Sequence, residues 1–318
     1  MMSLRGESVK ESFTASAAAR CRSLAFVTLH PRAAKSRQPA SVTGYLSRIG
    51  FSAEPEPTVA GLTELHRRHL DAVPYENLAI MLGRPDSTDP GETLGRIAAG
   101  GNAGYCFHQN GAFELVLRAL GFTVERRSGH VRGNEIPQLN NEIPQLNHLV
   151  LLVTIDGRRW WPDLGLGDGL REPVEVVAGG FRQGPFRYEI TDVGEEEWTF
   201  LHDPAAGSFG ALDVRASRPV DAEVAEAHRV LSTPPDGRFS RVLVVQRRDA
   251  TGTETLRGIR HQRKGDWAFS RDLASYDDWR HAMVSLGVSL GAAADDELRS
   301  LHTRMRDAHA EWAATVEG

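Results

Sequence analysis

Apolar residues recur at helical spacing in two stretches of the first half of the chain. Residues 58–73 form one such stretch after two prolines, and residues 106–120 form another. Gly121 follows the second stretch and is the kind of residue that ends a helix. A shorter helical turn is predicted up to Gly50, whereas the glycine, proline and aspartate content of residues 83–91 predicts a loop.

From Phe122 onward the pattern changes to short apolar or alternating runs separated by glycine turns. The predicted strands cover residues 148–155, 158–163, 173–177, 186–190, 198–201, 239–248 and 253–259. Two helices are predicted near the end of the chain, over residues 277–286 and 294–315. This order of helices, then strands, then mixed elements predicts an α+β protein with several domains.

The composition is that of a globular protein. The chain has 318 residues, of which 41% are hydrophobic and 25% charged, and this length allows two or three domains. A net charge of −5 gives no sign of a nucleic-acid partner, and the longest apolar run, residues 149–153, is too short to cross a bilayer. We therefore expect neither a nucleic acid nor a membrane as partner, and the oligomeric state stays open.

Only two cysteines, Cys21 and Cys106, occur in the sequence. They exclude a disulfide framework and a cysteine-rich zinc site. The zinc-protease pattern, two histidines four apart with a glutamate between them, does not occur around His66. We therefore expect no metal and a reducing, cytoplasmic location.

Residues 1–40 differ from the rest of the chain. They show no periodicity, and no acidic residue occurs between Ser12 and Ser47. We expect an extension that is disordered or does not belong to the folded protein, and a transit peptide is the alternative.

Cys106 is the first candidate for chemistry. It follows the glycine-rich residues 100–104 and begins a predicted helix, where unpaired N–H groups and the helix dipole favour the reactive thiolate. We expect it at the end of the apolar stripe of this helix, near the surface. The competing interpretation is a small, inert core residue that caps this stripe.

His148 and Asp163 are predicted to lie close together. Asp156-Gly157 is a strong signal for a two-residue hairpin turn, which would pair Ile155 with Arg158. In that register His148 and Asp163 are diagonal neighbours on one face of the sheet, with backbones roughly 7–8 Å apart. The competing interpretation is a histidine at a strand end and an ordinary turn aspartate.

A Cys–His–Asp set has a known chemistry. The histidine takes the proton of the thiol, the aspartate orients the imidazole, and the thiolate accepts an acyl group. Three other histidines compete for the role of base. We expect His108 to point away from Cys106 along the helix. We expect neither His130 nor His202 to have an acid nearby. Asp203 follows His202 directly, so on a strand its side chain would lie on the opposite face.

Five short motifs occur in an order that resembles the arylamine N-acetyltransferases. They are YLSRIG at 45–50, VPYENL at 73–78, GYCFHQN at 104–110, HLV at 148–150 and WPDLGLGDG at 161–169. The resemblance runs from about residue 42 to residue 263. Several separated motifs in the right order make it specific, which a single Cys-Phe-His-Gln-Asn would not be.

The resemblance implies a fold of three parts with a cysteine-protease-like Cys-His-Asp arrangement. A helical domain over residues 41–122 would carry the cysteine. An antiparallel β-barrel over residues 123–233 would carry the histidine and the aspartate. Residues 234–318 would form an α/β lid with the C-terminal helices.

The resemblance also implies the reaction. Acetyl-coenzyme A would be the donor and an aromatic amine or hydrazine the acceptor, in a ping-pong cycle through an acetyl-cysteine without a metal. Cys106, His148 and Asp163 match the catalytic triad of the family. The implied substrate-binding residues are Tyr75, Gly165, Leu166 and Gly167, the glycines because the backbone would approach a ligand there.

The sequence departs from the family pattern in three places. Asn102-Ala103 replaces an Arg-Gly pair whose arginine braces the loops around the cysteine, so the loop of the nucleophile should be looser and activity is in question. Leu166 replaces a common aromatic residue and predicts a roomier or less selective acceptor pocket. The peptide NEIPQLN occurs twice, at 134–140 and 141–147.

The doubled peptide ends directly before His148. Both copies end in asparagine, so His148 has the same predecessor with one copy or two. Doubling a flexible loop costs only about 0.6 kcal/mol in closure entropy, which favours a tolerated accident. The alternative is a lip that changes acceptor access to the site.

Three other functions remain open beside acetyl transfer. The same triad could serve an amide synthase with a bulky carrier-bound substrate, or a thioester hydrolase if water enters the site. The third is a degenerate protein that binds coenzyme A without turnover. Asn102, which replaces the arginine of the family pattern, is the reason to consider it.

Overall fold

The structure is a computed structural model that describes residues 40–133, 146–291 and 293–317. The expectation for residues 1–40 therefore falls outside the described residues, apart from Ala40 itself. The doubled peptide also lies outside them, except for its last two residues, Leu146 and Asn147.

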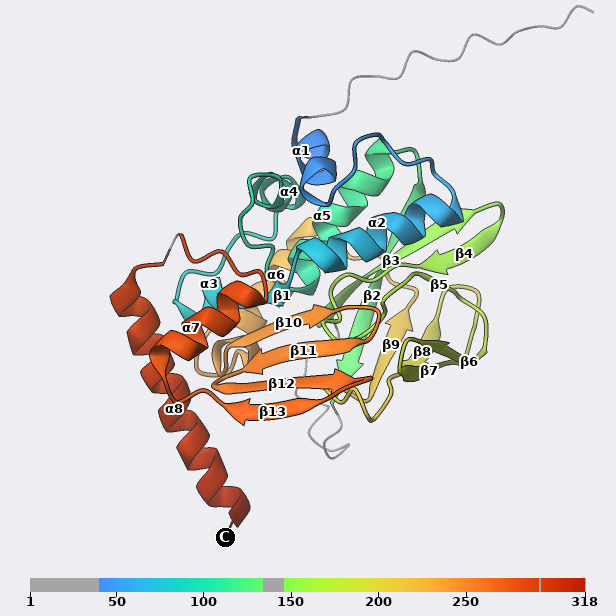
Figure 1. Cartoon of the computed structure of the whole chain (residues 1–318). Helices are drawn as coiled ribbons and strands as arrows, with labels where there is room; N and C mark the ends of the chain where they lie inside the picture. Colours follow the sequence, from blue (N-terminus) through green and yellow to red (C-terminus); the bar gives the residue numbers. More distant parts are fainter. Residues whose placement is uncertain (1–39, 134–145, 292, 318) are drawn as a thin grey trace, which may run out of the picture. The chain divides into compact units, whose positions relative to one another are not determined.

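The first part of the described chain is helical (Figure 1). Its elements are α1 (Ala40–Arg48), α2 (Val59–Ala72), β1 (Tyr75–Glu76), α3 (Leu78–Met81), α4 (Pro90–Ala98) and α5 (Cys106–Ala119). The apolar stripes of the longer helices, together with side chains of β3, form one core cluster that includes Leu62, Leu65, Phe113 and Leu117. Thr58, the first residue of the predicted helix, instead caps α2 by accepting the N–H of Gly61.

Eight strands form a curled antiparallel sheet in the middle of the chain. They are β2 (Thr123–Arg132), β3 (His148–Ile155), β4 (Arg158–Trp161), β5 (Val174–Glu175), β6 (Gly179–Gln183), β7 (Phe186–Thr191), β8 (Trp198–Leu201) and β9 (Ala211–Arg215). Their order is β5-β4-β3-β2-β9-β8-β7-β6. Among the described strands, β5 and β6 are the two edges, so the hydrogen-bonded ladder is not closed into a full barrel.

The last part combines helices with a second antiparallel sheet. Its elements are α6 (Asp221–Ser232), a 3-10 turn η2 (Arg238–Ser240), β10 (Val244–Arg248), β11 (Gly252–Arg257), β12 (Arg260–Gly265), β13 (Phe269–Asp272), α7 (Tyr276–Ser285) and α8 (Asp295–Glu317). The sheet order is β1-β10-β11-β12-β13, so the short strand β1 pairs with a strand far along the chain. The division into domains at residues 122 and 233 stays a prediction.

Three helices among the described residues, α3, α4 and α6, lie where the sequence predicted none. The predicted loop 83–91 ends earlier, because α4 starts at Pro90 with Asp89 accepting the N–H of Glu92. Two glycines within α4 weaken the helical signal there. Helix α6 was missed as well, and the predicted strand 239–248 begins with η2 and becomes a strand only at Val244.

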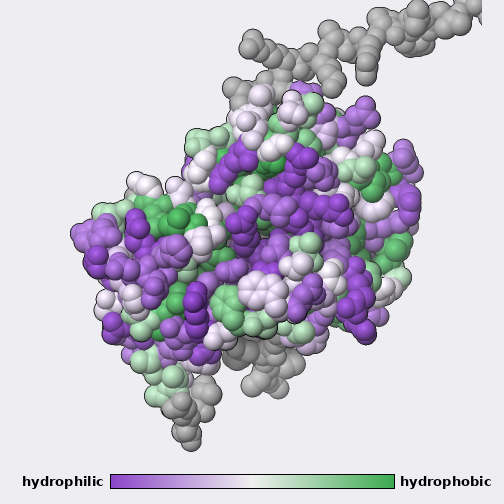
Figure 2. Space-filling model, in the orientation of Figure 1, coloured by the Kyte–Doolittle hydropathy of each residue, from purple (hydrophilic) through white to green (hydrophobic). Residues whose placement is uncertain are grey.

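Hydrophilic side chains cover much of the face shown in Figure 2, and hydrophobic ones form separate small areas. Within the described ranges, no helix is both long enough and apolar enough to span a membrane.

Candidate active site

Cys106 begins α5 and lines a cavity of about 920 Å³. Its side chain is buried, with only 2% exposed, so the expectation of a place near the surface is wrong. The apolar residues of the preceding loop and of β3 cover it, and the cavity is its route to ligands. A hydrogen bond links its side chain to His148, and its sulfur lies 3.8 Å from the backbone oxygen of Asn147.

His148 and Asp163 are in direct contact. The Asp156-Gly157 turn pairs Ile155 with Arg158, as predicted, and β4 ends at Trp161. Asp163 follows on the loop, and its Oδ2 lies 2.7 Å from His148 Nε2. The bond to Asp163 occupies Nε2, so Nδ1 is the ring nitrogen left for the sulfur. The structure thus brings the cysteine, histidine and aspartate together in one chain of hydrogen bonds.

Four donors fix the Asp163 carboxylate. Its Oδ1 accepts hydrogen bonds from Asn110 Nδ2 at 3.1 Å and from the N–H of Gly165 at 2.9 Å. Its Oδ2 accepts one from Trp161 Nε1 at 3.1 Å in addition to the bond from His148. Because the carboxylate is fully bonded, it holds the imidazole in one orientation.

The pKa of His148 is strongly shifted. Burial lowers this pKa, but the charges of Asp163 and Cys106 and the hydrogen bonds to both raise it to about 10. The imidazole therefore stays protonated well above neutral pH. An imidazolium next to a cysteine favours the thiolate, which is the nucleophilic form.

The shift predicts how stability depends on pH. Because the folded-state pKa of His148 lies above its usual value of about 6.5, the group stabilises the fold fully below that pH. This stabilisation is lost as the pH rises towards about 10. Urea unfolding of wild type and His148→Gln should give a larger stability difference at about pH 6 than at about pH 10. An equal difference at both values would contradict the shift.

The glycine loop after Asp163 packs directly on the nucleophile. A Cβ on Gly165 would lie 2.4 Å from the Cα of Cys106, so no larger residue fits there. Gly167 has a φ of +68°, and a Cβ added to it would clash with the side chain of Gln246. Gly165 and Leu166 line the cavity, whereas Gly167 is not among the cavity-lining residues. The close approach that explains Gly165 is thus one to the protein itself.

Tyr75 lies across the same cavity. Burial raises its pKa well above the usual value, and the nearby charges of Cys106 and Asp168 raise it further. Tyr75 lines the cavity together with Cys106 and packs against the same core cluster, on the short strand that pairs with β10.

Side-chain hydrogen bonds hold the loop before Cys106. Arg48 donates hydrogen bonds to the carbonyls of Ile97 and Gly101, at 2.8 and 2.6 Å. The buried Glu76 accepts the N–H of Gly104 at 2.6 Å. Asn102 itself pairs with the backbone of Ser289 through both side-chain atoms, at 2.9 and 2.8 Å. These contacts brace the loop.

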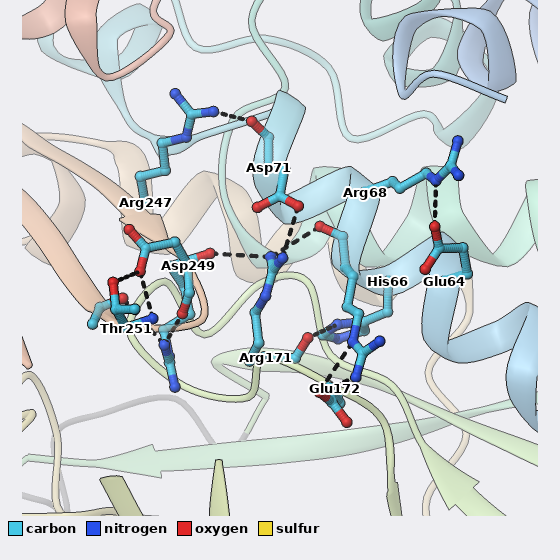
Figure 3. Close-up of polar contacts among 12 residues, drawn as sticks. Glu64, His66, Arg68, Asp71, Arg171, Glu172, Arg247, Asp249 and Thr251 are labelled. Carbon is cyan, nitrogen blue, oxygen red and sulfur yellow. Dashed lines mark hydrogen bonds and ion pairs between the residues drawn. The ribbon is translucent and has the colours of Figure 1, made fainter. Parts of the chain in front are cut away.

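Helix α2 supports the segment on both sides of the glycine loop (Figure 3). The imidazole of the buried His66 contacts the backbone of Asp163 and, at 3.0 Å, the carbonyl of Arg171. Arg171 reaches Asp71 at 2.7 Å, and Arg67 bonds to Glu172. Burial lowers the pKa of His66 to about 4, so it acts as a neutral bridge.

A second buried pair consists of His202 and Asp168. His202 was expected to have no acid nearby, but its Nε2 lies 3.6 Å from Asp168 Oδ1, so this expectation is wrong. Asp168 comes from the glycine loop rather than from a neighbour of His202, which is why local spacing gave no sign of it. Asp168 also accepts hydrogen bonds from the N–H and hydroxyl of Ser208, at 3.1 and 2.5 Å.

Asn147 anchors the start of β3. Its side chain accepts the N–H of Val131 at 2.7 Å and donates to the carbonyl of Val131 at 3.1 Å. It therefore extends the pairing of β3 with β2 and fixes the residue before His148.

Asn147 leads to a prediction for the doubled peptide. Deleting residues 141–147 leaves Asn140 directly before His148, so stability and acceptor profile should stay the same. Asn147→Ala should instead lower the unfolding free energy by about 1–3 kcal/mol, because buried backbone groups lose a partner. Urea unfolding and rates with several acceptors measure both. A changed acceptor profile in the deletion variant would support the alternative that the doubled peptide controls acceptor access to the site.

Within the described parts of the chain, no group of three or more His, Cys, Asp or Glu side chains is placed to hold a metal ion. The site consists of a buried thiol, an imidazole and a carboxylate beside a cavity, which suits nucleophilic acyl transfer.

Comparison with known proteins decides the family. A sequence model described as N-acetyltransferase matches residues 58–286, well over half of the chain. The chain belongs to this N-acetyltransferase family. Members similar to it include an arylamine N-acetyltransferase of Mycolicibacterium smegmatis, 32% identical over 213 residues, which are 64% of this chain and 74% of that protein. The Escherichia coli arylamine N-acetyltransferase is 32% identical over 48% of this chain and 53% of its own length, so the matched part spans about half of that relative.

Solved structures of arylamine N-acetyltransferases share the fold of this family member. The Salmonella typhimurium protein superposes with a TM-score of 0.74 over 84% of this chain and 99% of that chain, at 22% identity. The Mycobacterium marinum protein in complex with CoA gives a TM-score of 0.73 over 83% and 98%, at 22% identity. At this identity the likeness concerns the mixed helix-and-sheet fold.

Proposed function

We propose that this member of the family is an arylamine N-acetyltransferase, which moves an acetyl group from acetyl-coenzyme A to an aromatic amine or hydrazine. The observation that carries the proposal is the chain of hydrogen bonds from Cys106 through His148 to Asp163 beside a cavity. The relatives are named for this activity, and the similar Mycobacterium marinum structure is a complex with CoA. A free thiolate nucleophile suits a reducing compartment such as the cytoplasm.

The first half-reaction would acetylate Cys106. The thiolate attacks the thioester carbonyl carbon, a new S–C bond forms, and the bond to the coenzyme sulfur breaks. The His148 imidazolium gives its proton to the leaving coenzyme thiolate and becomes neutral. Asp163 keeps the ring oriented throughout, because its carboxylate is fixed by Asn110 and the N–H of Gly165.

The second half-reaction would discharge the enzyme. The amine nitrogen attacks the acetyl carbon, His148 takes a proton from that nitrogen, and the S–C bond breaks to restore the thiolate–imidazolium pair. Tyr75 and Leu166 line the cavity beside the sulfur and would contact the acceptor. Gly165 would contribute by keeping the backbone close to Cys106, and Gly167 by keeping the loop close to Gln246.

Steady-state kinetics test the proposal. Parallel double-reciprocal lines for acetyl-coenzyme A and an aniline would support a ping-pong cycle through one covalent intermediate. Continuous release of coenzyme A without any acceptor would instead support the thioester hydrolase. Binding of the coenzyme without release or transfer would support the degenerate binding protein.

A further inference from the structure

The five-stranded sheet turns a polar face to the cavity. Alternate residues of β11 and β12 line it, because side chains alternate between the two faces of a strand. The lining residues of β10, β11 and β12 are Val244, Gln246, Thr253, Thr255, Arg257, Gln262 and Lys264. All but the first are polar or charged, so this wall of the cavity is suited to bind a ligand with polar groups.

Thr253 has a buried hydroxyl that lacks a hydrogen-bond partner among the described residues. The residue is only 4% exposed and lines the cavity, and its Oγ1 makes no hydrogen bond within the described residues. An unpaired buried hydroxyl is unfavourable, because the group has lost its water. A ligand in the cavity would supply the missing partner.

Lys264 lies directly opposite Thr253 in the sheet register. Its Nζ donates to the carbonyl of Ala206 at 3.2 Å, and it belongs to no ion pair found within the described residues, where the cavity carboxylate of Asp168 lies against His202. An ammonium has three N–H groups, so one hydrogen bond leaves donors for a ligand. The lysine is also the only one after residue 40, in a chain with three lysines and 34 arginines.

The carboxylate of Asp168 shares the cavity but is occupied. It accepts two hydrogen bonds from Ser208 and faces His202. The contacts of Asp168 are thus with Ser208 and His202, and none of them is with Lys264.

The position of Lys264 limits what the ligand can be. Tyr75 pairs with Gln246, which pairs with Thr255 and then Gln262 across the sheet. Gln262 thus lies three strand spacings from Tyr75, and Lys264 lies two residues further along β12. These two perpendicular displacements place the Lys264 backbone roughly 16 Å from that of Tyr75. A small aniline at the nucleophile is too short to reach it. The bound group must belong to an extended ligand.

We propose that Lys264, Thr253 and Gln262 form an oxyanion subsite at this end of the cavity. It would bind a phosphate of coenzyme A or the carboxylate of an extended arylamine acceptor, since ammonium, hydroxyl and amide groups all donate to such oxygens. The subsite rests on the proposed function for the identity of these two ligands.

The test compares Lys264→Gln with Arg306→Gln, which also removes one positive charge but lies exposed on α8, outside the cavity. Calorimetry measures the dissociation constants of coenzyme A and of pantetheine, which lacks the phosphates. They are also measured for 4-(4-aminophenyl)butanoate against 4-butylaniline. Binding needs no turnover, so the subsite is tested even if acetyl transfer fails.

Lys264→Gln should raise the dissociation constant of one charged ligand about tenfold or more and leave that of its neutral analogue unchanged. An effect on coenzyme A alone identifies a phosphate, and an effect on the butanoate alone identifies an acceptor carboxylate. Unchanged binding of both charged ligands, or equal losses with the neutral analogues, would overturn the proposal.

Thr253→Val provides a second variant that does not depend on charge. Because the hydroxyl has no hydrogen-bond partner in the described part of the chain, its loss should leave the free energy of unfolding unchanged or raise it, yet weaken binding of the same charged ligand. Lower stability with unchanged binding would show a purely structural role and count against the subsite.

Discussion

Replacing Cys106 by alanine is expected to lower the rate of acetyl transfer by about 10⁶-fold, on the scale of losing the nucleophile of a catalytic triad. The thiol is the only described group that combines a place in the cavity with a hydrogen bond to the His148 imidazole. Without the sulfur no covalent intermediate forms. The measurement is the rate of acetylated aniline formation with saturating acetyl-coenzyme A.

The alanine variant should stay folded and still bind the coenzyme. The side chain is small and lies against a cavity, so its removal perturbs little packing. Urea unfolding and calorimetry with coenzyme A check both points. A folded Cys106→Ala variant with wild-type transfer would show that the acetyl group passes directly between substrates.

Asp163→Asn is expected to lower the rate of transfer by about 10⁴-fold, as the same change does in a serine-protease triad. An asparagine whose carbonyl keeps the bonds from Asn110 and Gly165 must turn its NH₂ group towards His148. The ring would then accept at Nε2 and carry its proton at Nδ1, facing the sulfur. In that tautomer it cannot take the proton of the thiol.

Asp156→Asn is the matched control for this change. Asp156 is exposed in the turn of the same hairpin with a φ of +51°, a conformation that asparagine tolerates. Its rate should equal that of the wild type. If both variants lost activity equally, the loss would reflect the hairpin rather than the carboxylate at residue 163.

The contact between His148 and Asp163 was predictable because a local signal determines it. Asp156-Gly157 sets the turn and pairs Ile155 with Arg158, which brings the chain after β4 back beside the start of β3. Asp163 nevertheless contacts His148 from the loop after Trp161, and not from the predicted strand 158–163. The start of α5 at Cys106 was predictable for a similar reason, since a glycine loop and an apolar stripe mark it.

Contacts between distant segments could not be predicted from local patterns. Asp168 meets His202, and Arg48 braces the loop before Cys106, because the packed fold brings these segments together. The burial of Cys106 has the same origin, since residues from α6 and β3 cover the start of α5. Helix α4 was hidden by its two glycines, although Asp89 and Pro90 are good helix-start residues.

Covalent transfer through Cys106 can be followed in the intact mass of the protein after mixing with acetyl-coenzyme A, without any acceptor. We expect one added acetyl group on the wild type and none on Cys106→Ala. The added group should be lost when an aniline or hydrazine is supplied. A wild type that binds the coenzyme but never gains an acetyl group would contradict covalent transfer through Cys106.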